Sequence, residues 1–194
     1  MKTMKNFLKA IILMATISAP FVMLPSCSDN EDDVDYNYDL PPTAEKVSAI
    51  ERDGVIMTYA LLNSQGDTTM TFREGENIFF DLTIENTTDE HIYIPGGPRT
   101  LGNNTFRVFT TSGKDCGTSW SYVEDWTMRA ALLCAHTTYH YQCPWYNDSN
   151  IKPIGPFVLK ASHKKLTRGA YFTEAYCYLS NGTTLYCKLW FKIE

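Results

Sequence analysis

Two cysteines and two histidines lie close together in the sequence and could bind a metal ion. They follow the spacing C-x-H-x3-H-x2-C, at Cys134, His136, His140 and Cys143. Thiolates and imidazoles are the ligands that zinc takes in tetrahedral sites, although only the histidine pair has a usual spacing. That pair requires a helix through His140, whereas the threonines and tyrosine at 137–139 favour an extended chain.

A disulfide is the other use for these cysteines, and the histidines are then merely polar. The segment contains Cys116, Cys134 and Cys143. We favour a disulfide here, with Cys134 and Cys143 as the principal candidates, and predict no metal site. Which of the three cysteines pair is left open by the spacing alone.

A second pair of cysteines flanks a hairpin turn near the C-terminus, at residues 180–183. Cys177 and Cys187 both fall on the apolar side of their strands. A loop with an odd number of residues would place them on one face and could set them opposite each other. A two-residue Asn-Gly turn would instead place Cys177 beside Tyr186. We predict a Cys177–Cys187 disulfide, with two buried thiols as the alternative.

Aromatic side chains are concentrated in residues 115–150 and could form a binding surface. Exposed rings bury a large area at little entropic cost, which suits stacking on sugar faces or a protein interface. The alternative is that several rings pack this segment onto the rest of the domain. We expect Trp145 and Tyr146, beside Pro144, to be the most exposed. The candidate ligand-binding residues are Trp120, Trp126, Tyr139, Tyr141, Trp145 and Tyr146, with Tyr122 in the same group.

The sequence contains none of the common catalytic motifs. It has no G-x-S-x-G, no H-E-x-x-H and no phosphate-binding glycine loop. Cys134 could serve as a nucleophile, with His136 or His140 as its base, only if a disulfide does not consume the thiol. We therefore predict a protein that is not an enzyme and that takes no cofactor.

The N-terminus has the pattern of an export signal. Lys2, Lys5 and Lys9 precede an apolar run at 10–24, which is short for a membrane-spanning helix. The next residues, Leu24-Pro25-Ser26-Cys27, resemble the lipobox of a bacterial lipoprotein, with Pro25 where a small residue is more usual. The resemblance implies that residues 1–26 are removed and that Cys27 becomes a lipidated N-terminus. The alternative is an ordinary secretory signal.

Residues 27–45 form an acidic tether. They contain the acidic residues Asp29, Glu31, Asp32, Asp33, Asp35, Asp39 and Glu45. Pro41 and Pro42 lie between the last two of these acids. The stretch resembles the acidic export signal of Bacteroides-type lipoproteins displayed on the outer face of the outer membrane. Any such stretch is also a solvated, self-repelling linker. We expect a lipid-anchored protein at the cell surface, whose partners are the membrane and a glycan or protein ligand.

Residues 46–194 are long enough for one domain with a single core. They contain 14 basic and 15 acidic residues. Nucleic-acid-binding domains carry a basic patch, so this near-neutral balance argues against a nucleic-acid partner.

A period of two in the apolar residues predicts that this domain is built of strands. In 77–85, Ile78, Phe80, Leu82 and Ile84 share one face, and Phe106 and Val108 are expected to point inward. In the last strand Leu185, Cys187, Leu189, Phe191 and Ile193 face one way, and Tyr186, Lys188, Trp190 and Lys192 face the other. Strands are expected at 55–62, 68–72, 77–85, 91–94, 105–111, 157–161, 171–179 and 185–193.

Short polar turns join these strands, so we predict an all-β, antiparallel sandwich of about eight strands. The strands at 55–62 and 68–72 are expected to form a hairpin. The insert at 115–150 differs: a capping box at 121–124 predicts one short helix over 126–134, and residues 137–150 look irregular.

Several stretches of the domain resemble the Ig-like domains of Bacteroides-type lipoproteins. They are residues 72–78 with 81–87, 106–109 with 112–113, and the ending 166–171 with 189–191. The layout is also loosely similar to the intracellular proteinase inhibitor (BsuPI) domain. The resemblance covers about two-thirds of the domain and carries no catalytic residues. It implies an Ig-like sandwich that binds a glycan or protein, with a proteinase-inhibitor-like module as the alternative.

Overall fold

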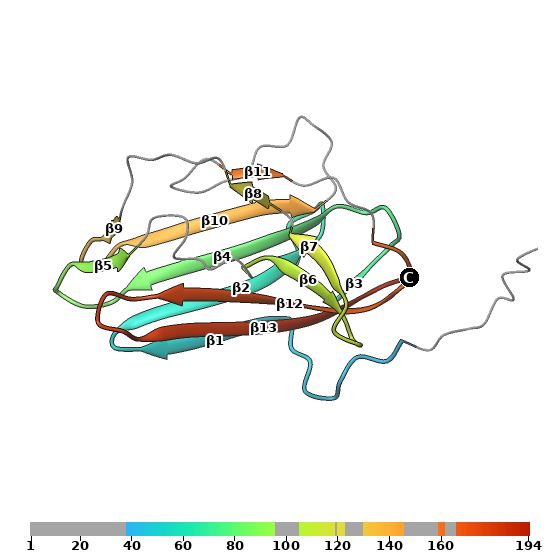
Figure 1. Cartoon of the computed structure of the whole chain (residues 1–194), viewed down its shortest axis with the longest axis horizontal. Coiled ribbons are helices and arrows are strands. Elements are labelled where there is room, and N and C mark those ends of the chain that lie inside the picture. The colour runs from blue at the N-terminus through green and yellow to red at the C-terminus, as the bar shows by residue number, and fades with distance from the viewer. Residues whose placement is uncertain (1–37, 96–104, 119, 123–129, 146–158, 162–165) are drawn as a thin grey trace, which may run out of the picture. The chain divides into compact units, whose positions relative to one another are not determined.

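A computed structural model describes residues 38–95, 105–118, 120–122, 130–145, 159–161 and 166–194 (Figure 1). The chain divides into two units, 1–35 and 36–194, and all of the described residues belong to the second. Every regular element within the described ranges is a β-strand. The predicted signal peptide, the predicted lipidation site Cys27 and the first part of the predicted tether lie outside these ranges.

The first layer of the domain is a four-stranded antiparallel sheet in the order β1-β2-β4-β10. Its strands are β1 (Val47–Arg52), β2 (Val55–Leu62), β4 (Ile78–Asn86) and β10 (Thr138–Trp145). Alternate residues of β4 are buried, from Ile78 to Ile84, as the period of two predicts. Asp53 and Gly54 join β1 to β2 with φ values of 52° and 71°, the left-handed conformation that tight hairpin turns require.

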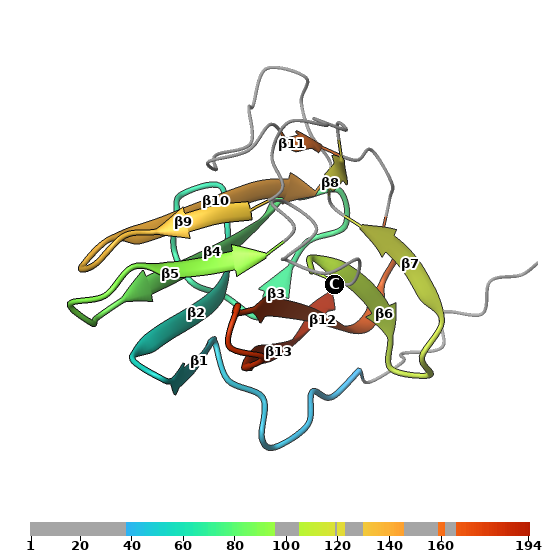
Figure 2. The ribbon, with the colours of Figure 1, turned by 60° about the vertical axis from the view of Figure 1, so that its left-hand side comes forward.

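The second layer is built on the long hairpin of β12 (Gly169–Tyr178) and β13 (Thr184–Ile193). The short strand β3 (Thr71–Phe72) pairs with β13 in parallel. At the other edge, β6 (Arg107–Thr110) lies beside β12, as both views show (Figures 1 and 2). The amide of Phe106 donates to the Glu174 carbonyl at 2.9 Å there. Strand β6 continues into β7 (Asp115–Thr118) through a hairpin.

Two further ribbons complete the described strands. Strand β5 (Ile92–Pro95) pairs with β9 (Ala130–Leu133), and β8 (Trp120–Tyr122) pairs with β11 (Leu159–Ala161), both antiparallel. Buried Asn86 ties the end of β4 to the first ribbon, because its Nδ2 donates to the carbonyls of Leu133 and Cys134 at 3.2 and 3.1 Å.

The core lies between the two layers. Phe80 of β4 packs against Phe106 and Trp145, with ring centroids 5.8 and 5.9 Å apart. Phe191 of β13 packs against Tyr171 at 5.5 Å. Each large apolar side chain that is fully buried contributes about 1.5–3 kcal/mol, so this cluster supplies most of the drive to fold.

Most of the predicted strands are confirmed. The prediction for 55–62 matches β2, and those for 77–85, 171–179 and 185–193 match β4, β12 and β13 within two residues. Phe106 and Val108 are both buried. The inward-facing set predicted for the last strand, from Leu185 to Ile193, is buried as well.

Three local predictions are wrong. The predicted helix over 126–134 is β9 at Ala130–Leu133, and residues 123–129 lie outside the described ranges. Residues 138–145, expected to be irregular, form β10 because their aromatic and branched side chains complete the first sheet. The expected hairpin of 55–62 with 68–72 reduces to one isolated bridge, Leu62 with Thr68, and β3 pairs with β13 instead. Strands β1, β7 and β8 were also not predicted.

Candidate functional site

The outward face of the β12–β13 hairpin carries a row of aromatic side chains. The register sets Phe172 opposite Trp190 and Tyr176 opposite Tyr186. Side chains alternate along a strand, and the intervening residues of β12 are buried, so the row points away from the core. We call this surface the aromatic strip. It consists of Phe109, Phe172, Tyr176, Tyr178, Tyr186 and Trp190, together with Glu174 and Lys188.

The rings of the strip form two groups. In the first, Phe109 of β6 stacks on Phe172 at a centroid distance of 5.1 Å, and Phe172 contacts Trp190 at 5.1 Å. In the second, Tyr176 contacts Tyr186 at 4.9 Å. Centroid distances of 4.5–7 Å are those of favourable aromatic pairs, so each group is a pre-arranged surface.

The second group includes the most exposed rings of the strip. Tyr178 stacks beside Tyr176 at 6.4 Å, with ring planes 8° apart. Tyr178 is 41% exposed and Tyr186 is 39% exposed. Both rings are therefore accessible to a ligand.

Glu174 positions the tyrosines of the second group. Its Oε2 accepts a hydrogen bond from the Tyr176 hydroxyl at 3.0 Å, and its Oε1 accepts one from the Tyr186 hydroxyl at 2.9 Å. The pKa of Tyr176 is raised to about 12, and the pKa of Tyr186 is raised as well. The larger cause is burial, and the second is the Glu174 carboxylate, which would repel a tyrosinate. Both hydroxyls are therefore protonated at neutral pH and can donate to the carboxylate.

Lys188 lies opposite Glu174 in the register but turns to the first group of rings. Its Nζ is 3.7 Å from the centroid of Phe172 and 4.3 Å from that of Trp190. Such a cation–π contact stabilises an exposed site by about 0.5–1 kcal/mol and holds the ammonium at the strip surface. The strip thus combines ring faces, hydroxyl groups and a positive charge.

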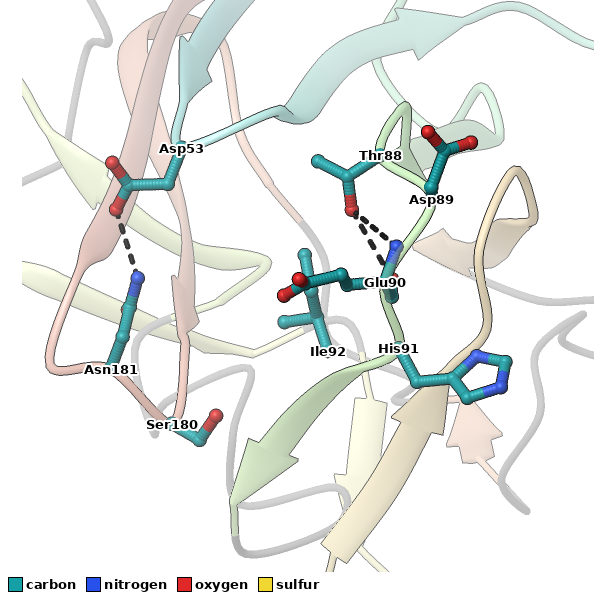
Figure 3. A pocket seen from close by; sticks show the side chains of 8 residues that line it. All are labelled: Asp53, Thr88, Asp89, Glu90, His91, Ile92, Ser180 and Asn181. Atoms are coloured by element: carbon teal, nitrogen blue, oxygen red, sulfur yellow. Dashed lines mark hydrogen bonds between the residues drawn. The ribbon is translucent and has the colours of Figure 1, made fainter.

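A pocket of about 510 Å³ is the other candidate, at the end of the domain where three turns meet (Figure 3). It is lined by Asp53, Thr88, Asp89, Glu90, His91, Ile92, Ser180 and Asn181. Asp53 accepts hydrogen bonds from the Thr183 hydroxyl and the Asn181 amide. Both bonds lower the pKa of the Asp53 carboxyl, and the bond from Thr183 has the larger effect. The other two carboxylates lie on Asp89, which contacts His136, and on Glu90.

The acidic rim of this pocket does not amount to a metal centre. Over the described ranges, no group of three or more histidine, cysteine, aspartate or glutamate side chains is placed to hold a metal ion. The Asp53 carboxylate joins the β1–β2 turn to the β12–β13 turn, which is a structural role. The aromatic strip is therefore the stronger candidate for a binding surface.

Comparison with known proteins assigns no function to either surface. The chain matches no protein-family model and no curated protein. Nor does the part of the chain that the structure describes contain a helix long and apolar enough to cross a membrane.

The aromatic residues singled out from the sequence do not form one exposed surface. Trp145, expected to be among the most exposed, is fully buried in the core, and so is Tyr141. Both belong to β10, whose inner face covers the core, so the expected exposure of Trp145 is wrong and neither ring is available at the surface of the described residues. Tyr139 is half-buried, and its hydroxyl donates to the Leu132 carbonyl at 2.8 Å.

The remaining members of that predicted set are not described at side-chain level. Trp120 and Tyr122 lie in β8, whose backbone alone is described. Trp126 and Tyr146 lie outside the described residues. Their assignment to a ligand site stays a prediction.

The predicted Cys177–Cys187 disulfide is absent. The loop has five residues, 179–183, an odd number, so both cysteines do face the core. However, Cys177 pairs with Leu185, and Cys187 pairs with Ala175. Such a diagonal neighbour is about 7–8 Å away, beyond the usual Cα separation of a disulfide. The two residues are therefore buried thiols, the alternative left open by the sequence.

The four residues of the predicted zinc or disulfide segment take different directions. Cys143 is buried in the core, whereas His140, on the other face of β10, contacts Asp81 through its Nε2 at 2.6 Å. His136 contacts Asp89 at 2.8 Å, and the Cys134 thiol donates to the Leu132 carbonyl at 3.8 Å. No disulfide joins any of the cysteines in the described ranges, so the predicted Cys134 and Cys143 disulfide is not formed.

A signal for the aromatic strip was present in the sequence. The outward positions of an exposed strand are normally polar. Here they hold Phe172, Tyr176 and Tyr178 on one strand and Tyr186 and Trp190 on the next. The alternation alone would have flagged this face, but the aromatic density of residues 115–150 drew the prediction there.

Proposed function

We propose that this protein is a lipid-anchored, surface-displayed lipoprotein of the outer membrane whose Ig-like sandwich binds a glycan through the aromatic strip. The observation that carries the proposal is the pair of ring groups, held in register on β12 and β13, with Tyr178 and Tyr186 exposed. Aromatic faces attract the apolar faces of sugar rings, and the adjoining hydroxyls can exchange hydrogen bonds with sugar hydroxyls.

The shape of the strip favours an extended ligand. Phe172 and Tyr178 lie on one face of β12, six residues apart, which corresponds to about 20 Å along a strand. A sheet face of this kind offers a platform and not an enclosed cavity. We therefore expect an oligosaccharide or polysaccharide lying along the hairpin, in preference to a single sugar.

Binding without catalysis accounts best for the chemistry of the strip. Glycoside hydrolysis ordinarily uses two carboxyl groups on either side of the bond. The strip as defined contains one carboxylate, that of Glu174, and both of its oxygens accept hydrogen bonds from tyrosines. Glu174 is therefore assigned a role in positioning the tyrosine rings.

The proposed location rests on the N-terminal sequence. The basic residues, the apolar run at 10–24 and the sequence Leu24-Pro25-Ser26-Cys27 together support cleavage before Cys27 and its acylation. Two or more acyl chains make membrane residence stable, since each buried methylene contributes about 0.8 kcal/mol. The acidic residues after Cys27 would then space the domain from the lipid surface.

A mass measurement tests the anchor. The full-length chain, produced in a bacterium that processes lipoproteins, should yield a mature protein that starts at Cys27 and carries the mass of its acyl chains. The variant Cys27→Ser should lose that added mass and leave the membrane fraction. A mature N-terminus elsewhere, or an acyl-free Cys27, would contradict the proposed anchor.

A glycan array tests the binding function. The full-length protein should bind a subset of glycans, and Tyr186→Ala and Trp190→Ala should each weaken that binding about tenfold or more, as removal of a central aromatic contact does. Leu132→Ala is the control, because Leu132 is 37% exposed and lies on β9, which pairs with β5 and with neither strand of the β12–β13 hairpin. Glycan binding that survives both strip substitutions, or no glycan binding at all, would refute the proposal.

A further inference from the structure

The two charges at the centre of the aromatic strip are not equally available. Glu174 and Lys188 lie opposite each other, between the two ring groups. Both oxygens of Glu174 accept hydrogen bonds from the hydroxyls of Tyr176 and Tyr186. The Lys188 ammonium lies over two rings, and within the described residues it has neither a hydrogen-bond acceptor nor a carboxylate in contact. The charge that the strip offers to a ligand is therefore positive.

The next lysine on the same face differs in this respect. Lys192 lies four residues further along β13, and its Nζ forms an ion pair with the Glu194 carboxylate. Its charge is compensated within the chain, whereas that of Lys188 is held among aromatic rings. Lys192 thus provides a matched comparison for Lys188.

We propose that the ligand of the strip is an acidic oligosaccharide, whose sugar faces contact the aromatic rings while a carboxylate on one of its sugars is bound by the Lys188 ammonium. The inference rests on the proposed glycan binding and names the class of glycan. A chain that lies along β12 and β13 from Phe172 to Tyr178 passes the Glu174–Lys188 position. The ammonium carries three N–H donors and no acceptor, so a carboxylate placed there can accept a charge-assisted hydrogen bond from it.

The surroundings strengthen this contact. Lys188 is half-buried, and its neighbours Phe172 and Trp190 are half-buried as well, so solvent screening around the ammonium is lower than at a fully exposed lysine. A charge-assisted hydrogen bond is about twice as strong as a neutral one. An acidic glycan therefore gains affinity at this position that a neutral glycan of the same length does not.

Calorimetric titration of the full-length protein with two ligands tests the inference. The acidic ligand is a short oligogalacturonate, and the neutral ligand is a glucose oligomer with the same number of sugars. We expect the acidic ligand to bind about tenfold more tightly, which corresponds to one charge-assisted contact. Because the ammonium is only half-buried, salt still screens it in part, so this preference should shrink as salt is added.

Three variants identify the group responsible. Lys188→Gln should bring the ratio of the two Kd values close to one, and Lys188→Arg, which keeps the charge, should retain the preference. Lys192→Gln, which makes the same change in net charge on the same face, should also retain it. A preference that persists in Lys188→Gln, or disappears equally in Lys192→Gln, would overturn the inference.

The two proposals fail in different ways. Equal binding of both ligands by the wild-type protein refutes the acidic class but leaves glycan binding intact. Binding of neither ligand also refutes it, and the glycan array then decides the proposed function separately.

Discussion

The hydroxyl of Tyr59 on β2 and the hydroxyl of Thr173 on β12 form a hydrogen bond of 2.8 Å across the core, although 114 residues separate them in the sequence. Both residues are fully buried. Burial raises the pKa of Tyr59 well above its usual value, because a phenolate in the core would lose its hydration. This bond links the sheet of β2 to the sheet of β12 at one defined position.

The variant Tyr59→Phe should destabilise the domain by about 1–3 kcal/mol, because the Thr173 hydroxyl is then buried without this partner. Replacing both groups, in Tyr59→Phe with Thr173→Val, should cost less than the two single changes added together. Denaturant unfolding of the four proteins measures this coupling. Additive single effects would show that the bond contributes no net stability.

Gly54 is predicted to tolerate no side chain. Its φ is +71°, and a Cβ at this position would lie 2.2 Å from Cγ2 of Thr88. Gly54→Ala should therefore destabilise the domain by more than the roughly 1–2 kcal/mol that a left-handed L-residue costs by itself. Gly66→Ala is the control, because Gly66 has a φ of +86° and open space around it. Equal losses of unfolding free energy in the two variants would show that the clash with Thr88 contributes nothing.

The buried cysteines should be unreactive while the protein is folded. Burial raises the pKa of the Cys177 thiol to about 12 and also raises that of Cys187, and only the thiolate reacts with disulfide reagents. At mildly alkaline pH, thiol labelling of the native protein should proceed at the half-exposed Cys134 and not at these two residues. Labelling should become complete in denaturant. If reductant were needed to expose thiols at Cys177 and Cys187 after unfolding, they would have been joined in a disulfide.

Alkaline pH should destabilise the protein through the tyrosines of the strip. The pKa of Tyr176 is raised from 10.0 to about 12, so the folded state keeps a proton that the unfolded state releases. The stability due to this group is therefore complete below pH 10 and is lost as the pH rises towards 12 and beyond. Tyrosinate absorbance and unfolding measured across this range should change together.

Glu174→Gln gives this alkaline prediction its control. After burial, the Glu174 carboxylate is the next cause of the raised pKa of Tyr176. The substitution removes that carboxylate, so the tyrosine titration should move to lower pH. Glu85→Gln, on an exposed position of β4, should leave the titration where it is. A titration that is the same in both variants would mean that burial alone sets these pKa values.

Sequence patterns were most informative where a side chain's direction depends only on its own strand. The apolar residues of β4 and β13 alternate with a period of two, and the faces predicted from that alternation are confirmed. The same pattern was ambiguous for residues 126–134, where a capping box suggested a helix. There Ala131 and Leu133 are buried while Leu132 is exposed, because β9 pairs with β5, about 40 residues away in the sequence.

The amino-acid sequence by itself determined the all-β class, the principal strands and the face on which each of their side chains lies, because these follow from local alternation and turn chemistry. Only the tertiary structure decided which strands are neighbours and in what register. Register placed Cys177 beside Leu185 instead of Cys187, put Trp145 in the core, and brought Phe109 of β6 against Phe172 of β12. Pairing between distant strands depends on how the whole core packs, and no local spacing encodes it.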